Sequence, residues 1–583
     1  MAGGHPSAGL PATPEISGQD ETIMSEPKPR TGGQLIVDQL KAQGVERITC
    51  VPGESYLAVL DALHDAAIDV LVCRNEGGAA MMADAYGKLT GRPGICFVTR
   101  GPGATNASHG LHIAAQDSTP LILFVGQVER GMREREAFQE LDYRGAFGSI
   151  AKWAVEIDDP ARIPEIVARA FRVAMQGRPG PVVIALPEDV LIETASVPDA
   201  PYVAPAESYP HPADMARFAE LLEGAERPLM ILGGSRWTDE AQAGLIAFSE
   251  RYSLPVATSF RRGHLFPSDH PNYAGDVGIG PNPKLAKRVK EADVLILLGA
   301  RMSEMPSSSY TLIDIPAPRQ RLVHIHPGAE ELGKVYQPEI AIEASPAGFA
   351  KALADLSPGQ TPRWAQDTAT AHSDYLAWTE TPATLPGAFQ YGEAMLHLRN
   401  TLPPEAIVCN GAGNYATWLH RYYRLRKRGT QLAPTSGSMG YGVPAAIMAK
   451  RHKPDVPVVA FAGDGCFLMN GQEFATAVQY GIPLIVVVVD NGMYGTIRMH
   501  QEREYPGRIS ATKLKNPDFA AYARAFGGHG ETVERTEDFA PAFARAQASG
   551  LPAILHCKLD PEAITPATTL TAIRTAALER QAQ

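Results

Sequence analysis

Two polar side chains follow neighbouring apolar stretches in the last third of the chain. Asp464 stands between two glycines directly after the stretch 458–462, and Asn491 follows the next stretch, 484–489, with one residue between. Because parallel strands of one sheet end at the same edge, we expect both side chains there. A carboxylate repels a phosphate group unless a cation lies between them, and Mg²⁺ takes carboxylate, amide and backbone carbonyl oxygens as ligands. The spacing therefore predicts a metal–diphosphate site built by Asp464 and Asn491.

Three glycine turns follow predicted strands, at Gly101–Gly103, Gly233–Gly234 and Gly463–Gly465. Backbone N–H groups at such a turn, together with the start of the next helix, favour a bound phosphate. None of the turns completes the dinucleotide pattern G-x-G-x-x-G or the P-loop pattern, so both of those interpretations are weak. The run Ser436–Gly440 resembles the nucleophile elbow of serine hydrolases, but Ser436 stands where that motif requires glycine. We therefore reject a serine hydrolase.

Short apolar stretches that alternate with helical patterns must position these residues. Such alternation predicts βαβ units with parallel sheets. A proline-rich linker at Val197–Pro212 and an irregular segment at Ser357–Phe389 divide the chain into three such units. The predicted strands are Ile68–Cys73, Ile95–Thr99, Leu121–Gly126 and Val182–Leu186 in the first unit, Leu229–Leu232, Val294–Leu298 and Leu322–Ile325 in the second, and Val458–Ala462, Ile485–Val489 and Ala553–Lys558 in the third. The predicted fold class is therefore α/β, with doubly wound parallel sheets.

The first and third units share one arrangement. In each, a strand ends in a glycine turn, at Gly101 and at Gly463, and a Pro-Leu-Ile run opens the next strand, at Pro120 and at Pro483. An internal duplication of one supersecondary unit explains the similarity. Chance resemblance between two βαβ units is the alternative.

The composition of the 583 residues is that of a globular protein, with 45% hydrophobic and 20% charged residues. The 53 basic and 64 acidic side chains give a formal net charge of −11, without a basic cluster. An acidic chain of this kind is a poor partner for nucleic acid or an anionic membrane. No apolar run approaches the ~20 residues that span a bilayer. Fibrous, disordered and membrane classes are therefore excluded.

The six cysteines show no C-x-x-C spacing of a redox or zinc site, so we expect buried free thiols and a cytoplasmic location. Residues 1–30 are rich in Gly, Pro, Ala, Ser and Thr and lack the pattern of a signal peptide. We expect this segment to be a disordered tail, and Met24 within it is an alternative start of the natural chain.

Several motifs resemble those of the acetolactate (acetohydroxyacid) synthase family of thiamine diphosphate (ThDP) enzymes. Gly-Asp-Gly at 463–465, then 24 residues, then Asp490-Asn491 is similar to the ThDP fingerprint, which usually ends in Asn-Asn. Further similar segments are 74–80, 101–106, 126–128, 138–140, 177–181 and 439–446. The resemblance extends over about residues 32–560.

The family implies three α/β domains and a C-terminal extension. These would be a pyrimidine-binding domain at 31–196, a central domain at 213–356, a diphosphate-binding domain at 388–562 and a tail at 563–583. The resemblance further implies a homodimer, often paired into a tetramer, with active sites between subunits.

The resemblance also implies roles for individual residues at the cofactor. The family's cofactor-binding positions correspond here to Glu76, Gly437, Met439, Gly463, Asp464, Gly465, Asn491 and Met493, and its metal ligands to Asp464, Asn491 and Met493. Glu76 is the acid that engages N1′ of the pyrimidine. Gly437 offers its carbonyl to the 4′-amino group, and Met439 is the bulky residue that bends the cofactor.

Other positions face the substrate by the same resemblance. Gln127 is a second catalytic candidate, because it and the loop that begins at Gly101 would face the reacting carbonyl from the partner subunit. Arg100, Gly101, Thr496 and His500 are candidate substrate residues. Thr496 and His500 are four residues apart on a predicted helix from Tyr494 to His500, so they share one face of it.

Some positions depart from the family pattern. Asn75 replaces the His that usually precedes the catalytic Glu, and His500 stands where synthases of branched-chain precursors carry a Trp. Arg100 occupies a position where the family usually has a small residue. It either places a positive charge near a substrate carboxylate or forms a surface salt bridge. The segment 299–304 lacks the pattern of FAD-binding members, although the turn at 233–234 leaves FAD or another nucleotide open.

The resemblance implies a transferase or lyase that uses ThDP and Mg²⁺ to decarboxylate a small 2-oxo acid, pyruvate or a close relative, with carboligation. Alternatives within the class are a non-ligating 2-oxo acid decarboxylase, a 2-hydroxyacyl-CoA lyase and an enzyme that cleaves a C–C bond of a diketone. Outside the class, a non-catalytic protein with the ThDP fold is the alternative. The joint presence of Glu76, Asp464 and Asn491 argues against that last interpretation.

Overall fold

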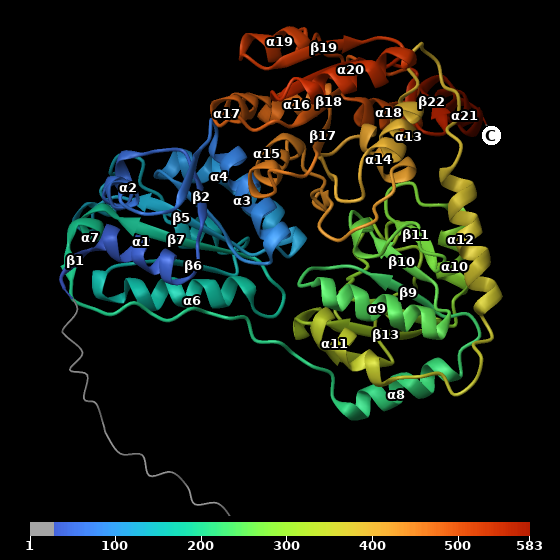
Figure 1. Ribbon diagram of the computed structural model, residues 1–583, viewed down its shortest axis with the longest axis horizontal. Coiled ribbons are helices and arrows are strands. Elements are labelled where there is room, and N and C mark those ends of the chain that lie inside the picture. The colour runs from blue at the N-terminus through green and yellow to red at the C-terminus, as the bar shows by residue number, and fades with distance from the viewer. Residues whose placement is uncertain (1–27, 583) are drawn as a thin grey trace, which may run out of the picture.

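The computed structural model describes residues 28–582, which form three α/β domains, each around a six-stranded parallel sheet (Figure 1). This confirms the predicted fold class. The predicted tail at 1–30 lies outside the described residues except for residues 28–30. Arg30 already pairs with Ala195, in the small antiparallel sheet of β1 (Arg30–Thr31) and β8 (Thr194–Ala195). Among the described helices, none is long and apolar enough to cross a membrane.

The first domain has the strand order β3-β2-β4-β5-β7-β6. Its strands are β2 (Arg47–Cys50), β3 (Asp69–Val72), β4 (Gly94–Val98), β5 (Leu121–Gln127), β6 (Trp153–Glu156) and β7 (Pro181–Pro187). Its helices are α1 (Gly32–Ala42), α2 (Leu57–His64), α3 (Glu76–Thr90), α4 (Gly101–Asp117), α5 (Tyr143–Phe147), α6 (Ile163–Met175) and α7 (Glu188–Ile192). The strands β4, β5 and β7 are buried along their whole length, which is why they read as continuous apolar runs. The sequence pattern missed β2 and β6, which are short and carry polar residues.

The central domain has the order β11-β10-β9-β12-β13-β14, so the chain changes direction across the sheet between β9 and β12. Its strands are β9 (Leu229–Leu232), β10 (Val256–Ser259), β11 (Tyr273–Val277), β12 (Val294–Leu298), β13 (Arg321–His326) and β14 (Ile340–Glu343). Its helices are α8 (Pro212–Glu223), α9 (Asp239–Tyr252), α10 (Pro283–Glu291) and α11 (Pro346–Ala352). The segment at 357–389 is not irregular throughout as expected. It contains α12 (Ala365–Thr379), whose buried Ala371 and Tyr375 pack on the central domain.

The third domain has the order β16-β15-β17-β18-β20-β19. Its strands are β15 (Ile407–Asn410), β16 (Gln431–Leu432), β17 (Val458–Gly463), β18 (Ile485–Asp490), β19 (His529–Val533) and β20 (Ala553–Lys558). Its helices are α13 (Tyr391–Thr401), α14 (Tyr415–Tyr422), α15 (Gly442–His452), α16 (Asp464–Asn470), α17 (Phe474–Gln479), α18 (Gly495–Glu504), α19 (Phe519–Ala525) and α20 (Thr536–Ala548). The first and third sheets therefore have the same order when their strands are counted along the chain, which supports the predicted duplication.

The predicted tail at 563–583 is structured over its described part. It forms the hairpin β21 (Ala563–Thr565) and β22 (Thr568–Thr569), followed by α21 (Leu570–Ala582). Leu570 and Ile564 pack with Met499 of α18 in a small apolar cluster. Apolar periodicity in α21 is weak, because only Leu570 and Ala577 are buried, and this explains why the sequence pattern missed the helix.

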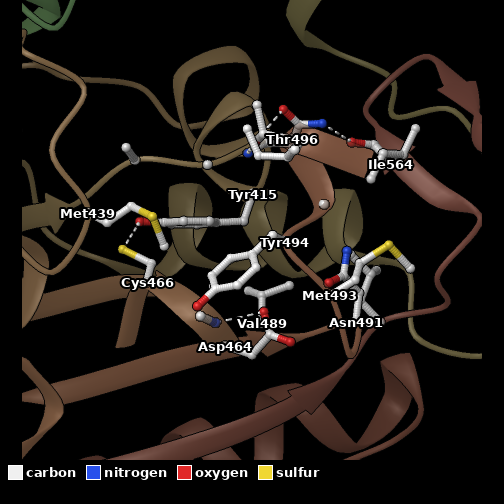
Figure 2. A pocket seen from close by; sticks show the side chains of 18 of the residues that line it. Tyr415, Met439, Asp464, Cys466, Val489, Asn491, Met493, Tyr494, Thr496 and Ile564 are labelled. Carbon is white, nitrogen blue, oxygen red and sulfur yellow. Dashed lines mark hydrogen bonds between the residues drawn. The ribbon is translucent and has the colours of Figure 1, made fainter. Parts of the chain in front are cut away.

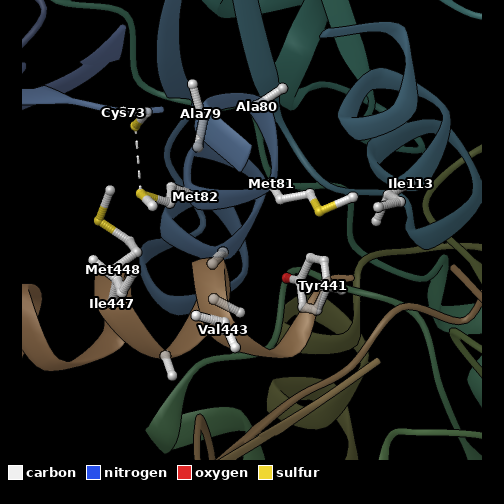
Figure 3. Close-up of a cluster of buried hydrophobic side chains, with 14 of the residues drawn as sticks. Cys73, Ala79, Ala80, Met81, Met82, Ile113, Tyr441, Val443, Ile447 and Met448 are labelled. Carbon is white, nitrogen blue, oxygen red and sulfur yellow. Dashed lines mark hydrogen bonds between the residues drawn. The ribbon is translucent and has the colours of Figure 1, made fainter. Parts of the chain in front are cut away.

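The first and third domains of the chain share one hydrophobic core. Helix α3 of the first domain packs on α15 of the third, with small and flexible side chains in contact (Figure 3). Met81, Met82 and Met448 fill the space that the alanines of α3 leave. All six cysteines are free and buried, as predicted.

Candidate active site

A cavity of about 230 Å³ opens at the carboxyl ends of β15, β17 and β18 in the third domain (Figure 2). Its lining includes Tyr415, Gly437, Met439, Gly463, Asp464, Gly465, Cys466, Asn491, Met493, Tyr494 and Thr496. Asp464 and Asn491, predicted at one sheet edge, both reach it. The cavity thus lies where ligands bind in open α/β sheets.

Asp464 is the first residue of α16 and is 3% exposed. One carboxylate oxygen accepts the N–H of Gly465 at 2.9 Å, and the other accepts the side-chain amide of Asn516 at 2.7 Å. Burial raises the pKa of Asp464 to about 6, and the charge of Asp490 contributes to the rise. Among the described residues, no cationic side chain pairs with this carboxylate. The site therefore favours a bound cation beside Asp464.

Asn491 and Met493 lie on one side of the cavity and are half-buried. No described residue forms a hydrogen bond with the Asn491 side chain, so its amide oxygen is available to a ligand. Together with Asp464 these residues offer a carboxylate, an amide oxygen and a backbone carbonyl. This donor set suits Mg²⁺.

Asp490, which replaces the usual Asn of the fingerprint, turns away from the cavity. Its carboxylate accepts hydrogen bonds from His556 at 2.9 Å and Lys558 at 2.7 Å. Although burial raises the pKa of Asp490, these hydrogen bonds hold it well below its usual range. In the sequence, Asp490 directly follows the predicted strand at 485–489 and Lys558 ends the one at 553–558, and the structure places the two residues in register on neighbouring strands.

The two glycines of the turn allow aromatic rings to approach closely. A Cβ at Gly463 would lie 3.0 Å from the ring of Tyr415, and a Cβ at Gly465 would lie 2.6 Å from the ring of Tyr494. The Tyr415 hydroxyl accepts the N–H of Gly411 at 3.0 Å. Sequence patterns missed both tyrosines, because nothing along the chain links them to the turn.

Glu76 begins α3 in the first domain, where its carboxylate accepts the side-chain amide of Asn106 at 2.9 Å. It is half-buried and does not line the cavity of its own chain. Of the residues that line this cavity, Asp464 is the one with a carboxylate.

Comparison with known proteins identifies the domains that carry the cavity and Glu76. Residues 30–146 match the family described as thiamine pyrophosphate enzyme, N-terminal TPP binding domain, residues 215–353 match its central domain, and residues 411–557 match its C-terminal TPP binding domain. The acetolactate synthase large subunit of Parasynechococcus marenigrum is 35% identical over 91% of this chain and 87% of the relative. The isozyme 2 large subunit of Escherichia coli is 32% identical over 91% of this chain and 95% of the relative. The chain belongs to the acetolactate synthase family.

Membership in this family makes the chain a thiamine diphosphate (thiamine pyrophosphate) enzyme. The domain that the family describes as C-terminal TPP binding contains the whole cavity turn at 463–465. Glu76 lies within the N-terminal TPP binding domain.

The structure gives other family positions of the first domain a local role. The side-chain amide of Gln127 donates to the carbonyl of Leu141 at 2.9 Å, and Gln127 does not line the cavity. The Gly101 N–H donates to the carbonyl of Gln139 at 2.9 Å. Arg100 is buried and is ion-paired with Glu54 at 2.5 Å and with Glu188 at 3.2 Å.

Helix α18 brings one of its two candidate substrate residues to the cavity. Thr496 lines it and exchanges hydrogen bonds with Asn414, both at 3.0 Å. His500, one turn later, is exposed and does not line the cavity. The helix is longer than predicted and extends to Glu504.

A second cavity, of about 360 Å³, lies at the β9/β12 switch point of the central domain. The turn at Gly234, the turn at Gly299 and the side chains of Arg262 and Arg301 line it. Gly234 has a φ of +68°, and a Cβ there would lie 2.4 Å from the Gly299 carbonyl, so the two turns meet only because both residues are glycine. The glycine turn at 233–234 thus opens onto a cavity, as a nucleotide site would require.

Proposed function

We propose that this member of the family uses ThDP and Mg²⁺ to decarboxylate a pyruvate-like 2-oxo acid and to join the remaining fragment to a second carbonyl compound. The observation that carries the proposal is the convergence of Asp464, Asn491, Met493 and the glycine turn on one cavity. The similar proteins named above are large subunits of acetolactate synthases. Bound ThDP would supply a nucleophilic carbon and an electron sink for the departing CO₂.

The residues of the cavity fit the cofactor and its metal. Asp464, Asn491 and the carbonyl of Met493 would hold Mg²⁺, and the metal would supply positive charge to offset the buried carboxylate and an anionic diphosphate. The turn at Gly463–Gly465 lines the cavity at the start of α16, and backbone N–H groups at a helix start would favour the diphosphate. Gly437 and Met439 line the same cavity and would hold the pyrimidine end.

A second copy of the chain would complete the site. The pyrimidine needs a carboxylic acid partner, and within one chain the lining carboxylate, Asp464, is used by the metal. Glu76 of a second copy would supply that acid, as the family arrangement implies. This makes the functional unit a homodimer or a pair of dimers.

The test is mass spectrometry of the purified protein under native conditions, followed by turnover assays with a panel of 2-oxo acids. The proposal expects bound ThDP, Mg²⁺-dependent release of CO₂ from pyruvate and a carboligation product. Release of CO₂ with free aldehyde as the sole product would replace it with simple decarboxylation. Absence of both ThDP retention and 2-oxo acid turnover would restore the non-catalytic alternative.

The same mass spectrum tests the central-domain cavity for FAD or another nucleotide. The six buried free cysteines support a reducing compartment such as the cytoplasm.

A further inference from the structure

We propose that Glu473 is a positioning residue: it holds the backbone of the two residues that precede Glu76 in the chain. The inference rests on the proposed function, because it concerns the role assigned to Glu76. Glu473 belongs to the third domain and Glu76 to the first, so the contact joins the two ThDP domains of one chain.

The carboxylate of Glu473 accepts the backbone N–H groups that lead into α3. It accepts the N–H of Asn75 at 2.9 Å and that of Arg74 at 3.0 Å on one oxygen and 3.2 Å on the other. The hydroxyl of Thr476 donates to it at 2.6 Å. Glu473 is 0% exposed, so water does not compete for these donors. Hydrogen bonds to a buried carboxylate are among the stronger ones in proteins.

These bonds hold the residue that sets the start of the helix. Asn75 is the N-cap of α3, and its side chain accepts the N–H of Gly77 at 2.8 Å. Glu76 is the first residue of the helix. With the N–H of Asn75 held from one side and its side chain engaged on the other, the direction in which Glu76 leaves the backbone is fixed.

Gly78 makes this approach possible. A Cβ at Gly78 would lie 2.6 Å from a carboxylate oxygen of Glu473. The third domain thus reaches the first turn of α3 at a point where the helix has no side chain. Burial raises the pKa of Glu473, and the hydrogen bonds oppose that rise.

The alternative is a purely structural contact between domains, and the chain offers a matched control for it. Tyr480, also in the third domain, bonds to the backbone of β3, the strand just before Arg74 and Asn75, at the N–H of Val72 (2.9 Å) and the carbonyl of Val70 (3.2 Å). Tyr480→Phe therefore removes an interdomain bond to β3 without touching the two residues before Glu76.

The experiment compares Glu473→Gln with Tyr480→Phe in the full chain. A glutamine keeps one acceptor oxygen but removes the charge that strengthens both bonds, takes away the second acceptor of the Arg74 N–H and turns an amide donor toward the Thr476 hydroxyl. In the absence of cofactor, we expect the amides of Arg74 and Asn75 to exchange with deuterium about tenfold faster in Glu473→Gln, since their buried acceptor is no longer charged. In Tyr480→Phe they should keep their protection. With ThDP bound, kcat should fall by about 10–100-fold in Glu473→Gln, with little change in the KM of the 2-oxo acid, because a small misplacement of a catalytic group has this scale of effect.

A double variant separates positioning from structure. If Glu473 acts through Glu76, Glu473→Gln should not slow turnover further in a Glu76→Gln background, whereas independent effects would multiply. Multiplied losses, or unchanged exchange at Arg74 and Asn75, would overturn the inference. A Glu76→Gln enzyme of normal rate would instead overturn the proposed function.

Gly78→Ala keeps the inference testable if Glu473→Gln does not fold. The new methyl group displaces the Glu473 carboxylate without removing it, and alanine favours the helix. For this variant we again expect faster amide exchange at Arg74 and Asn75 and a lower kcat. Exchange rates and a kcat equal to those of the wild type would overturn the inference.

Discussion

Asp464 and Asn491 serve one cavity from different local environments. The Asp464 carboxylate is buried and held by the Gly465 N–H and by Asn516, whereas the Asn491 amide is half-buried and unengaged by described residues. The carboxylate is therefore the preformed part of the proposed metal site, and the site depends on it most.

Asp464→Ala should lower the affinity for Mg²⁺ and ThDP by about 10–100-fold or more while the fold stays intact, because the substitution removes the proposed metal ligand rather than core packing. Fluorescence titration of the apo protein at limiting Mg²⁺ measures this. Glu531→Gln is the control, because Glu531 is an acid of β19 in the same domain that pairs with Arg545 and does not line the cavity, so the cofactor affinity should stay unchanged. Unchanged cofactor affinity in Asp464→Ala would show that the metal binds elsewhere.

Glu76→Gln should retain ThDP but reduce turnover by about 10²–10⁴-fold, the usual contribution of general acid–base catalysis. The substitution keeps the volume and the hydrogen-bond capacity toward Asn106 while it removes the acid. Hydrogen–deuterium exchange at C2 of bound ThDP, followed by NMR after acid quench, reports the step directly. Exchange at a rate near that of the wild type would contradict the role of Glu76 as the acid that activates ThDP.

At the scale of elements, the sequence predicted contacts between residues at the ends of neighbouring parallel strands. It did not predict contacts that depend on how helices and domains pack. Asp464 and Asn491 could be placed together because each directly follows a strand and neighbouring parallel strands share an edge. Glu473 and Tyr415 gave no such signal. Their contacts with Asn75 and the glycine turn depend on how α3, α14 and the turn between α16 and α17 pack. Short strands such as β16 were missed for a related reason, since two residues carry no periodicity.

Helix α21 is tied to α18 by a buried acid. Glu502 of α18 is paired with Arg574 of α21 at 2.6 Å and also with Arg498. The hydrogen bond from Arg574 lowers the pKa of Glu502 from 4.5 to about 2, although burial opposes this. Because the folded-state pKa is depressed, the stabilisation is complete above about pH 4.5 and is lost as the pH falls toward 2.

Glu502→Gln should therefore lower the free energy of unfolding at pH 7 by about 1.5–3 kcal/mol, the range for hydrogen bonds to a charged group. The difference from wild type should shrink between pH 4.5 and pH 3. Thermal unfolding at several pH values checks this, with Glu504→Gln as the control, since Glu504 is exposed on the same helix. An equal deficit at pH 7 and pH 3 would contradict the assignment.

The exposed position of His500 in the middle of α18 bears on the acceptor substrate. A Trp at this position would add a flat apolar wall, and one methylene in such a pocket is worth about 1–3 kcal/mol. His500 provides less apolar area, and in the structure it does not line the cavity. We expect no strong preference for 2-oxobutyrate over pyruvate as acceptor. Competition between the two, with both products quantified, is the measurement, and a large excess of the 2-oxobutyrate-derived product would restore a branched-chain synthase.

At the scale of the whole molecule, the shared core of α3 and α15 fixes the first and third domains of one chain in an arrangement that keeps Glu76 out of its own cavity. A site that needs both Asp464 and Glu76 must then be assembled from two copies. In a dimer with twofold symmetry, each site would combine Asp464 of one copy with Glu76 of the other.

Mixing two inactive variants tests this arrangement. A chain with Glu76→Gln keeps Asp464, and a chain with Asp464→Ala keeps Glu76, so in a mixed dimer one of the two sites is intact and the other carries both defects. The two variants are co-expressed with different tags, the mixed species is purified, and turnover is measured against each variant alone. With one intact site of two, activity should return to about half of the wild-type value in the purified mixed dimer. If each chain used its own Glu76, every site would carry one defect, and the mixed dimer would be as inactive as its parents.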